Sequence, residues 1–214
     1  MNLHEQRRAY GRGVLRDDLL AADPLTLLAD WLRDAVRAPE LEPTAMALAT
    51  VAADGTPSNR YVLCKALDAR GLQFFTGTES RKGGELAATG KAAAVFWWPV
   101  AERSARVVGA VTQLPRADVA SYFASRPLGS RRSAWASRQS DPVQSRAALE
   151  ASRAEIEGRF AEDEPTDPPD DWGGYLLAPL EIELWQGRDD RFHDRLAFRR
   201  EAPGAPWSAA RLQP

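Results

Sequence analysis

Residues 44–77 read TAMALATVAADGTPSNRYVLCKALDARGLQFFTG and carry the clearest architectural signal in the chain. Three short runs rich in Val, Leu, Tyr and Phe are separated by the turn sequences ADGTP and LDARG, a pattern that favours antiparallel hairpins. We therefore expect an antiparallel β-meander here. KAAAVFWWP and ARVVGAVTQL predict two more strands, and WGGYLLAPLEIELWQG returns to strand character near the C-terminus.

Helix signals flank these strands instead of alternating with them. DPLTLLADWLRDAVRA begins with Asp23 as a candidate N-cap and Pro24 at the first helical position, which predicts a helix over residues 24–37. Capping residues and prolines predict three further helices, over residues 80–90, about 116–125 and 142–160. Strands with segregated helices indicate an α+β fold around an antiparallel barrel.

The length of 214 residues suits one substantial domain, which we assign to residues 23–214, after a flexible polar arm over residues 1–22. A net charge of −2 gives no general attraction to nucleic acid or to anionic membranes, so any anion site must be local. The single cysteine, Cys64, excludes an intramolecular disulfide and suits a reducing cytoplasm. No run is apolar enough to span a bilayer, and the histidines and the cysteine lack metal-site spacing.

Basic clusters are the candidate binding sites. In NRYVLCK, Arg60 and Lys65 lie at opposite ends of a mostly buried run, where they either bind two anionic groups or are charged strand ends exposed to water. In TGTESRKGG, Arg81 and Lys82 occupy the first turn of a predicted helix, against its macrodipole. That placement becomes favourable if an anion binds at the helix N-terminus, so it is the least ambiguous phosphate signal in the chain.

A further cluster lies in SYFASRPLGSRRSAW. Tyr122 and Arg126 are four residues apart on a predicted helix and share a face, with Ser130 in the loop that follows. A phenol, a guanidinium and a hydroxyl together suit a phosphate monoester. A basic helix end that interacts favourably with the macrodipole explains the same pattern.

The stretch WQGRDDRFHDRLAF, residues 185–198, carries one of only two histidines. Read as a strand from Asp190 to Leu196, it places Arg191, His193 and Arg195 on one face. This face is either a solvated edge strand or a wall that holds an anion or an electron-rich ring, with His193 able to exchange a proton near neutral pH.

Together these motifs resemble the pyridoxine/pyridoxamine 5'-phosphate oxidase family in order and spacing, from about Arg7 to Pro214. The matching stretches are RRAY, DPLTLLADWL, PTAMALATV, R-x-V-L-x-K, F-F-T-x-x-x-S-R-K, YFASRP, S-x-QS, WGG and E-x-WQG-x-x-x-R-x-H-D-R. The resemblance implies a split-barrel flavoprotein, a homodimer with FMN at the subunit interface. It also implies oxidation of pyridoxamine or pyridoxine 5'-phosphate to pyridoxal 5'-phosphate, with O2 as electron acceptor and H2O2 as product.

The resemblance also implies residue roles. The positions that match FMN contacts are Arg60, Lys65, Phe75, Thr76, Arg81, Lys82, Gln139, Ser140, Trp185 and Arg195. Those that match the pocket for the substrate phosphate are Lys65, Tyr122, Arg126 and Ser130. Arg191 and His193 match the catalytic pair at the pyridine end of the substrate.

Two positions depart from the family pattern. Ser104 stands where the family usually has Gln, so one side-chain contact to the flavin ring is missing or replaced by water. Ala9 stands where an acidic residue is common. Two alternatives therefore stay open: an oxidase of the same fold that acts on another ring, such as a phenazine precursor, and a flavin- or pyridoxal-phosphate-binding protein without turnover.

Overall fold

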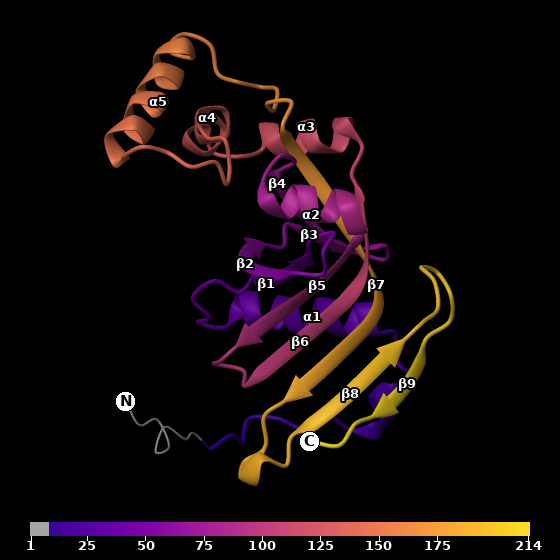
Figure 1. Ribbon diagram of the computed structural model, residues 1–214. Helices are drawn as coiled ribbons and strands as arrows, with labels where there is room; N and C mark the ends of the chain where they lie inside the picture. The colour runs from indigo at the N-terminus through magenta and orange to yellow at the C-terminus, as the bar shows by residue number, and fades with distance from the viewer. Residues whose placement is uncertain (1–8) are drawn as a thin grey trace.

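The computed structural model describes residues 9–214, which form one curled antiparallel sheet of nine strands with five α-helices around it (Figure 1). The strands are β1 (Ala45–Val51), β2 (Pro57–Leu63), β3 (Ala66–Asp68), β4 (Gly71–Gly77), β5 (Lys91–Trp98), β6 (Arg103–Gln113), β7 (Trp172–Gln186), β8 (Asp194–Arg199) and β9 (Ser208–Arg211). The helices are α1 (Pro24–Arg37), α2 (Arg81–Thr89), α3 (Arg116–Ala124), α4 (Leu128–Ala136) and α5 (Arg146–Arg159), with short 3₁₀ helices η1 (Asp17–Ala21) and η2 (Asp189–Arg191). The predicted α+β class and antiparallel barrel are confirmed.

Residues 44–77 form two hairpins and not the continuous meander that we expected. β1 pairs with β2 and β3 pairs with β4, but β2 and β3 lie at opposite ends of the strand order β2-β1-β5-β6-β7-β4-β3. A meander would need β2 to pair with β3; instead β1 takes β5 as its second partner and β4 takes β7. The chain crosses between the two edges at Cys64 and Lys65, and the sheet curls until β2 contacts β4. A cleft can therefore open beside this contact.

The long strand β7 joins the two halves of the sheet. Its first part pairs with β4, its last part pairs with β8, and β6 runs along nearly all of it. The register shifts between Val108 and Gly109, as at a β-bulge. A Cβ on Gly109 would lie 2.0 Å from the carbonyl oxygen of Ala178, so the close approach of the strands requires glycine.

Helix α1 contributes to the main core, as its apolar spacing predicts. The Asp23 side chain accepts the backbone N–H of Thr26 at 2.8 Å and caps the helix. Leu28 and Trp31 are buried, and the Trp31 ring meets Trp98 edge-on with centroids 6.3 Å apart. The buried residues of the sheet complete this core, among them Met46, Leu48, Phe96, Ile182, Leu184 and Phe198.

The other helices match the expectations only in part. α5 begins at Arg146 and not at Pro142, because the Ser145 hydroxyl accepts a backbone N–H of the first turn at 3.1 Å. α4 has no counterpart among the predicted helices; Pro127 stands just before its first turn, where the missing N–H breaks no helical hydrogen bond. Ser130 therefore lies in α4 and not in a loop. Within residues 9–214, no helix has both the length and the apolar character needed to cross a membrane.

Part of the segment that we expected to be a flexible arm is attached to the sheet. Leu15 is buried, and its N–H donates to an oxygen of Asp194 at 3.1 Å. η1 follows, and β9 packs against it. Residues 1–8, where the RRAY motif begins, lie outside the described residues.

Candidate active site

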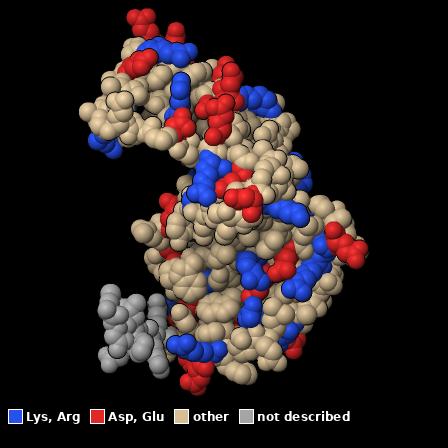
Figure 2. Space-filling view, in the orientation of Figure 1, with Lys and Arg blue, Asp and Glu red and all other residues tan. Residues whose placement is uncertain are grey.

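A cleft of about 800 Å³ opens beside the contact between β2 and β4. It is lined by residues of β2, α3 and α4, together with the end of β4 and the first turn of α2. Figure 2 shows the molecule indented between its α4–α5 part and the strands, with Lys and Arg side chains at the edge of the indentation. The predicted site residues that line the cleft are Arg60, Lys65, Phe75, Thr76, Arg81, Lys82, Tyr122, Arg126, Gln139 and Ser140.

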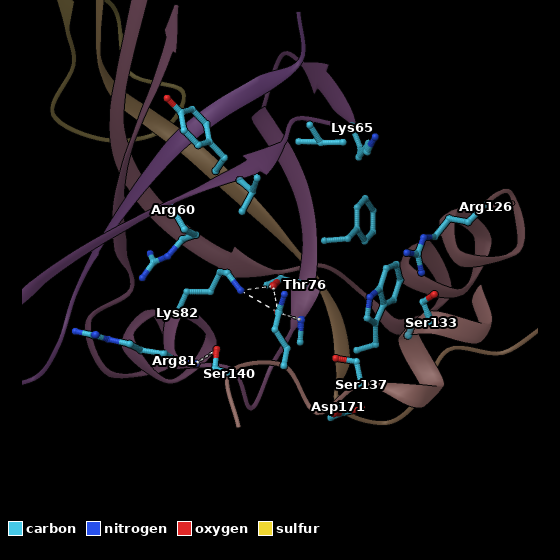
Figure 3. Close-up of a pocket in the computed structure, with 18 of the residues that line it drawn as sticks. Arg60, Lys65, Thr76, Arg81, Lys82, Arg126, Ser133, Ser137, Ser140 and Asp171 are labelled. Atoms are coloured by element: carbon cyan, nitrogen blue, oxygen red, sulfur yellow. Dashed lines mark hydrogen bonds between the residues drawn. The ribbon is translucent and has the colours of Figure 1, made fainter. Parts of the chain in front are cut away.

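Lys82 is a buried cation, only 6% exposed, in the first turn of α2. Its Nζ donates hydrogen bonds to Thr76 Oγ1 (2.7 Å) and Gln139 Oε1 (2.9 Å) (Figure 3). A third goes to Ser80 Oγ (3.2 Å), and all three acceptors are neutral oxygens. Burial, followed by the nearby Arg60, lowers the pKa of Lys82 to about 8. An anion added beside this ammonium would favour its charged form.

Glu85 neutralises part of the charge around Lys82. Its carboxylate accepts hydrogen bonds from Arg81 Nε at 2.9 Å and Ser58 Oγ at 2.5 Å, and it pairs with Arg60 at 3.3 Å. Burial alone would raise the pKa of Glu85, but these and other hydrogen bonds outweigh burial and lower the pKa to about 2. Three cations and one carboxylate leave two net positive charges, which match a phosphate dianion.

The turn that leads into α2 is tightly packed. Ser80 caps the helix by accepting the N–H of Gly83, and a Cβ on Gly83 would lie 2.1 Å from the carbonyl oxygen of Thr78. Ser140 adopts a positive φ of 80°, unusual for a residue with a side chain, and its Oγ accepts the N–H of Arg81 at 3.3 Å. Backbone strain of this kind is often found at binding sites.

Arg126 forms a second cationic site, across the cleft from Arg60 and Lys82 (Figure 3). Its guanidinium carbon lies 4.8 Å from the ring centroid of Trp172, and its Nη1 is buried without a hydrogen-bond partner. Burial lowers the pKa of Arg126, and no carboxylate among the described residues pairs with it. Lys65 lies on the same side of the cleft. This pair of cations suits a second phosphate.

Three aromatic rings form a wall of the cleft. The ring of Phe75 stacks on Tyr122 with centroids 3.9 Å apart, and on Trp172 with centroids 5.5 Å apart. Burial raises the pKa of Tyr122, so its phenol stays a neutral hydrogen-bond donor at physiological pH. The cleft therefore combines a flat apolar surface with cations on either side.

The C-terminal motif lies away from this cleft within one chain. Trp185 and Arg195 face each other in the β7–β8 ladder, and Arg195 Nε donates to Glu183 at 2.9 Å. The predicted alternation of three side chains along one strand is wrong. Arg191 belongs to η2 and has a positive φ of 61°, and β8 begins only at Asp194, because the preceding turn interrupts the extended backbone.

His193 lies in a small aromatic cluster of its own. Its ring centroid is 4.6 Å from that of Trp185 and 5.8 Å from that of Tyr10. The backbone N–H of Arg188 donates to His193 Nδ1 at 3.1 Å, so the neutral ring carries its proton on Nε2. Burial, followed by the nearby Arg191, lowers the pKa of His193. At neutral pH His193 therefore offers an Nε2–H donor.

Some residues around the cleft differ from those that the sequence singled out. Ser130 does not line the cleft, whereas Ser133 of the same helix and Ser137, the residue just after the helix, do. Glu85 also belongs to the site and was not predicted, although its position four residues after Arg81 on a helix is a signal for an ion pair. Sequence spacing could not reveal which serines in and after an unpredicted helix face the cleft.

Comparison with known proteins identifies the family of this chain. A family model described as pyridoxamine 5'-phosphate oxidase matches residues 32–160, and one described as the pyridoxine 5'-phosphate oxidase C-terminal dimerisation region matches residues 172–214. Two curated proteins, both named pyridoxine/pyridoxamine 5'-phosphate oxidase, are similar over nearly the whole chain. The one from Thermosynechococcus vestitus is 50% identical over 208 residues, 97% of each chain, and the one from Cupriavidus necator is 48% identical over 212 residues, 99% of each chain.

Solved structures share the fold. PhzG from Burkholderia lata 383, in complex with tetrahydrophenazine-1-carboxylic acid, has a TM-score of 0.86 at 34% identity, covering 95% of this chain and 100% of that one. A pyridoxamine 5'-phosphate oxidase-related, FMN binding protein from Nostoc punctiforme has a TM-score of 0.70 at 18% identity, covering 88% and 96%, which is a likeness of fold alone. With both family models matched and half of all residues shared with a full-length relative, the chain belongs to the pyridoxamine 5'-phosphate oxidase family.

Proposed function

We propose that this chain is an FMN-dependent oxidase that converts pyridoxamine or pyridoxine 5'-phosphate to pyridoxal 5'-phosphate, with O2 as electron acceptor and H2O2 as product. The observation that carries the proposal is the presence of two cationic sites on opposite sides of one aromatic-walled cleft. One site suits the phosphate of the cofactor and the other suits the phosphate of the substrate. The names and identities of the curated relatives support the same activity.

The residues around Lys82 fit FMN. The net positive charge of the cluster and the buried ammonium match a phosphate dianion, and the adjacent Phe75 offers a flat apolar surface. Gln139 and Ser140 add polar groups at the same end of the cleft. When bound, the flavin supplies the redox chemistry, accepting a hydride and reducing O2. The protein supplies binding, orientation and electrostatics.

Arg126, Lys65 and Tyr122 hold the substrate phosphate in this proposal. The buried Nη1 of Arg126 has no other partner, and the neutral phenol of Tyr122 donates a further hydrogen bond. Ser130 remains a predicted contact from the first turn of α4. Anchoring the phosphate at this end fixes the position of the pyridine ring in the cleft.

A second copy of the chain completes the site. Residues 172–214 match the dimerisation region of the family, and the homodimer that this implies can bring residues of one copy to the cleft of the other. The outer face of the sheet suits such an interface, because Tyr61 is 79% exposed and Trp97 is 48% exposed on it, among alanines of β1 and β5. We place FMN at this interface, with Arg191 and His193 of the second copy facing the substrate.

In this arrangement His193 and Arg191 act on the pyridine end of the substrate. The Nε2–H of His193 donates a hydrogen bond near the reacting substituent, since Nδ1 is already engaged by a backbone N–H. Arg191 packs over the pyridine ring. Trp185 and Arg195 would contact the flavin, and Arg195 would add positive charge beside it.

Anaerobic mixing with pyridoxamine 5'-phosphate tests the function directly. FMN-loaded protein should lose its yellow colour as the flavin is reduced, and air should restore the colour and yield H2O2. Arg191→Ala should keep FMN but lose turnover, whereas Arg81→Ala should mainly lose FMN. Lys91→Ala, at an exposed lysine of β5, is the matched control and should change neither. An FMN-loaded protein that never bleaches would refute the proposal.

Oxidation of another ring is the second candidate function, because PhzG has the same fold at 34% identity. The second cationic site favours a phosphorylated substrate. Tetrahydrophenazine-1-carboxylic acid offered in the same anaerobic assay separates the two functions. We also propose that the enzyme works in the cytoplasm, because a single cysteine suits a reducing compartment.

A further inference from the structure

Glu102 joins the N-terminal segment to the loop that carries His193. It lies in the turn between β5 and β6, and only 3% of it is exposed. Its Oε2 accepts the backbone N–H groups of Gly11 at 2.8 Å and of Arg12 at 3.0 Å. Its backbone oxygen accepts the N–H of Gly187 at 2.8 Å. One residue thus holds two segments that are far apart in the sequence.

The burial and the backbone conformation of Glu102 are both energetically unfavourable. A carboxylate loses hydration when it is buried, and its φ of 56° is in the left-handed region that residues with side chains rarely adopt. Gln186 fixes the turn from the other side, because its Nε2 donates to the backbone oxygens of Ala101 and Glu102 at 3.3 and 3.1 Å. Such features persist where the surrounding structure enforces them, and they concentrate at functional sites.

The segment that Glu102 holds carries Tyr10 directly before Gly11. The Tyr10 ring packs edge-on against Trp185 and against His193, with centroids 5.8 Å apart in both cases. Gly187 leaves room for the ring, because a Cβ there would lie 2.7 Å from Tyr10 Cγ. The hydrogen bonds of Glu102 therefore set the position of Tyr10 against the histidine.

We propose that Glu102 is a positioning residue for the reaction: by fixing Gly11 and Arg12 it holds Tyr10 against His193 and keeps the histidine in the orientation that offers its Nε2–H. Glu102 is not among the residues that line the cleft, and it acts through Tyr10. The inference rests on the proposed function for its catalytic consequence, but the contact between the segments can be tested without turnover.

The kinetic test uses FMN-loaded protein and a double-mutant cycle. Glu102→Ala should lower kcat/KM about tenfold, which corresponds to about 1.4 kcal/mol. Tyr10→Ala should cause a similar loss, and the double variant should be no worse than either single variant. Glu102→Gln keeps an acceptor oxygen for both N–H groups and should restore most of the activity. Additive losses in the double variant, or normal kcat/KM in Glu102→Ala, would overturn the proposal.

Two readouts do not depend on activity. Trypsin should cleave after Arg12 and Arg16 about tenfold faster in Glu102→Ala than in the wild type or in Glu102→Gln. The chain has two histidines, so one His193→Asn variant assigns the ring resonances of His193, and their ¹⁵N shifts report its tautomer. The Nε2–H tautomer should dominate in the wild type and be mixed in Glu102→Ala and Tyr10→Ala. An unchanged tautomer in both variants would overturn the positioning role. A wild type that is inactive as an oxidase would refute the proposed function but not the positioning role, because the tautomer is measured without turnover.

Discussion

Lys82 should take up a proton when the phosphate of FMN binds beside it. Its pKa is lowered from the ordinary 10.5 to about 8, chiefly by burial. Because the folded-state pKa lies below the unfolded value, the unfolded chain binds the proton more tightly. Lys82 therefore lowers the free energy of unfolding most strongly below about pH 8, and this destabilisation fades as the pH rises towards 10.5. A bound phosphate favours the charged ammonium and raises the pKa again.

The expected uptake follows from the pKa of Lys82. At pH 8.5 a lysine with a pKa of about 8 is charged in about a quarter of the molecules. A phosphate that raises the pKa by about two units makes the lysine charged in nearly all of them, so binding takes up about 0.7 proton. The phosphate of FMN, with a second pKa of about 6, is already a dianion at pH 8.5. At pH 7 the lysine is mostly charged before binding, and the uptake should fall close to zero.

Isothermal titration calorimetry measures this uptake. Flavin-free protein is titrated with FMN at pH 8.5 in two phosphate-free buffers whose ionisation enthalpies differ, and the difference in heat gives the number of protons. Lys82→Met should bind FMN more weakly and with almost no proton uptake, whereas the exposed Lys91→Met should behave like the wild type. Wild-type uptake below about 0.2 proton, or full uptake in Lys82→Met, would refute the reasoning.

Three further predictions concern the same cleft. Gly83→Ala should lower the free energy of unfolding by about 1–3 kcal/mol in urea titrations, because its Cβ would lie 2.1 Å from the carbonyl oxygen of Thr78. Gly84→Ala has nothing within 4 Å and should be neutral or stabilising by up to about 1 kcal/mol; equal losses in both would contradict the packing of this turn. The pKa of Glu85 is lowered to about 2, so its contribution to stability is present above its unfolded pKa and is lost as the pH falls towards 2. The wild type should therefore lose stability more steeply than Glu85→Gln between about pH 5 and pH 3, and parallel curves would be inconsistent with this account. Arg126→Ala should raise KM for pyridoxamine 5'-phosphate about 10- to 100-fold with FMN affinity unchanged, and a loss of FMN instead would assign Arg126 to the cofactor.

The sequence by itself determined the local elements and the chemistry of the cations. Asp23 and Pro24 locate the start of α1, and Ser80 locates the start of α2, because capping depends only on residues within one helical turn. For the same reason Arg81 and Lys82 could be placed at a helix N-terminus, where an anion is favoured. The motifs also identified the family, because their order and spacing in the sequence can be read without knowing how the strands pair.

The tertiary structure decided which of these groups meet. The hydrogen bond from Thr76 to Gln139 joins residues 63 positions apart, and those from Gly11 and Arg12 to Glu102 join residues 91 and 90 positions apart. Local sequence patterns do not predict which residues meet over such separations. Local alternation placed Arg191 on a strand, but a turn with positive φ replaces that strand and no periodicity predicts it. The cleft itself exists because the curl of the whole sheet brings together β2 and β4, which belong to two separate hairpins. That curl depends on every strand between them.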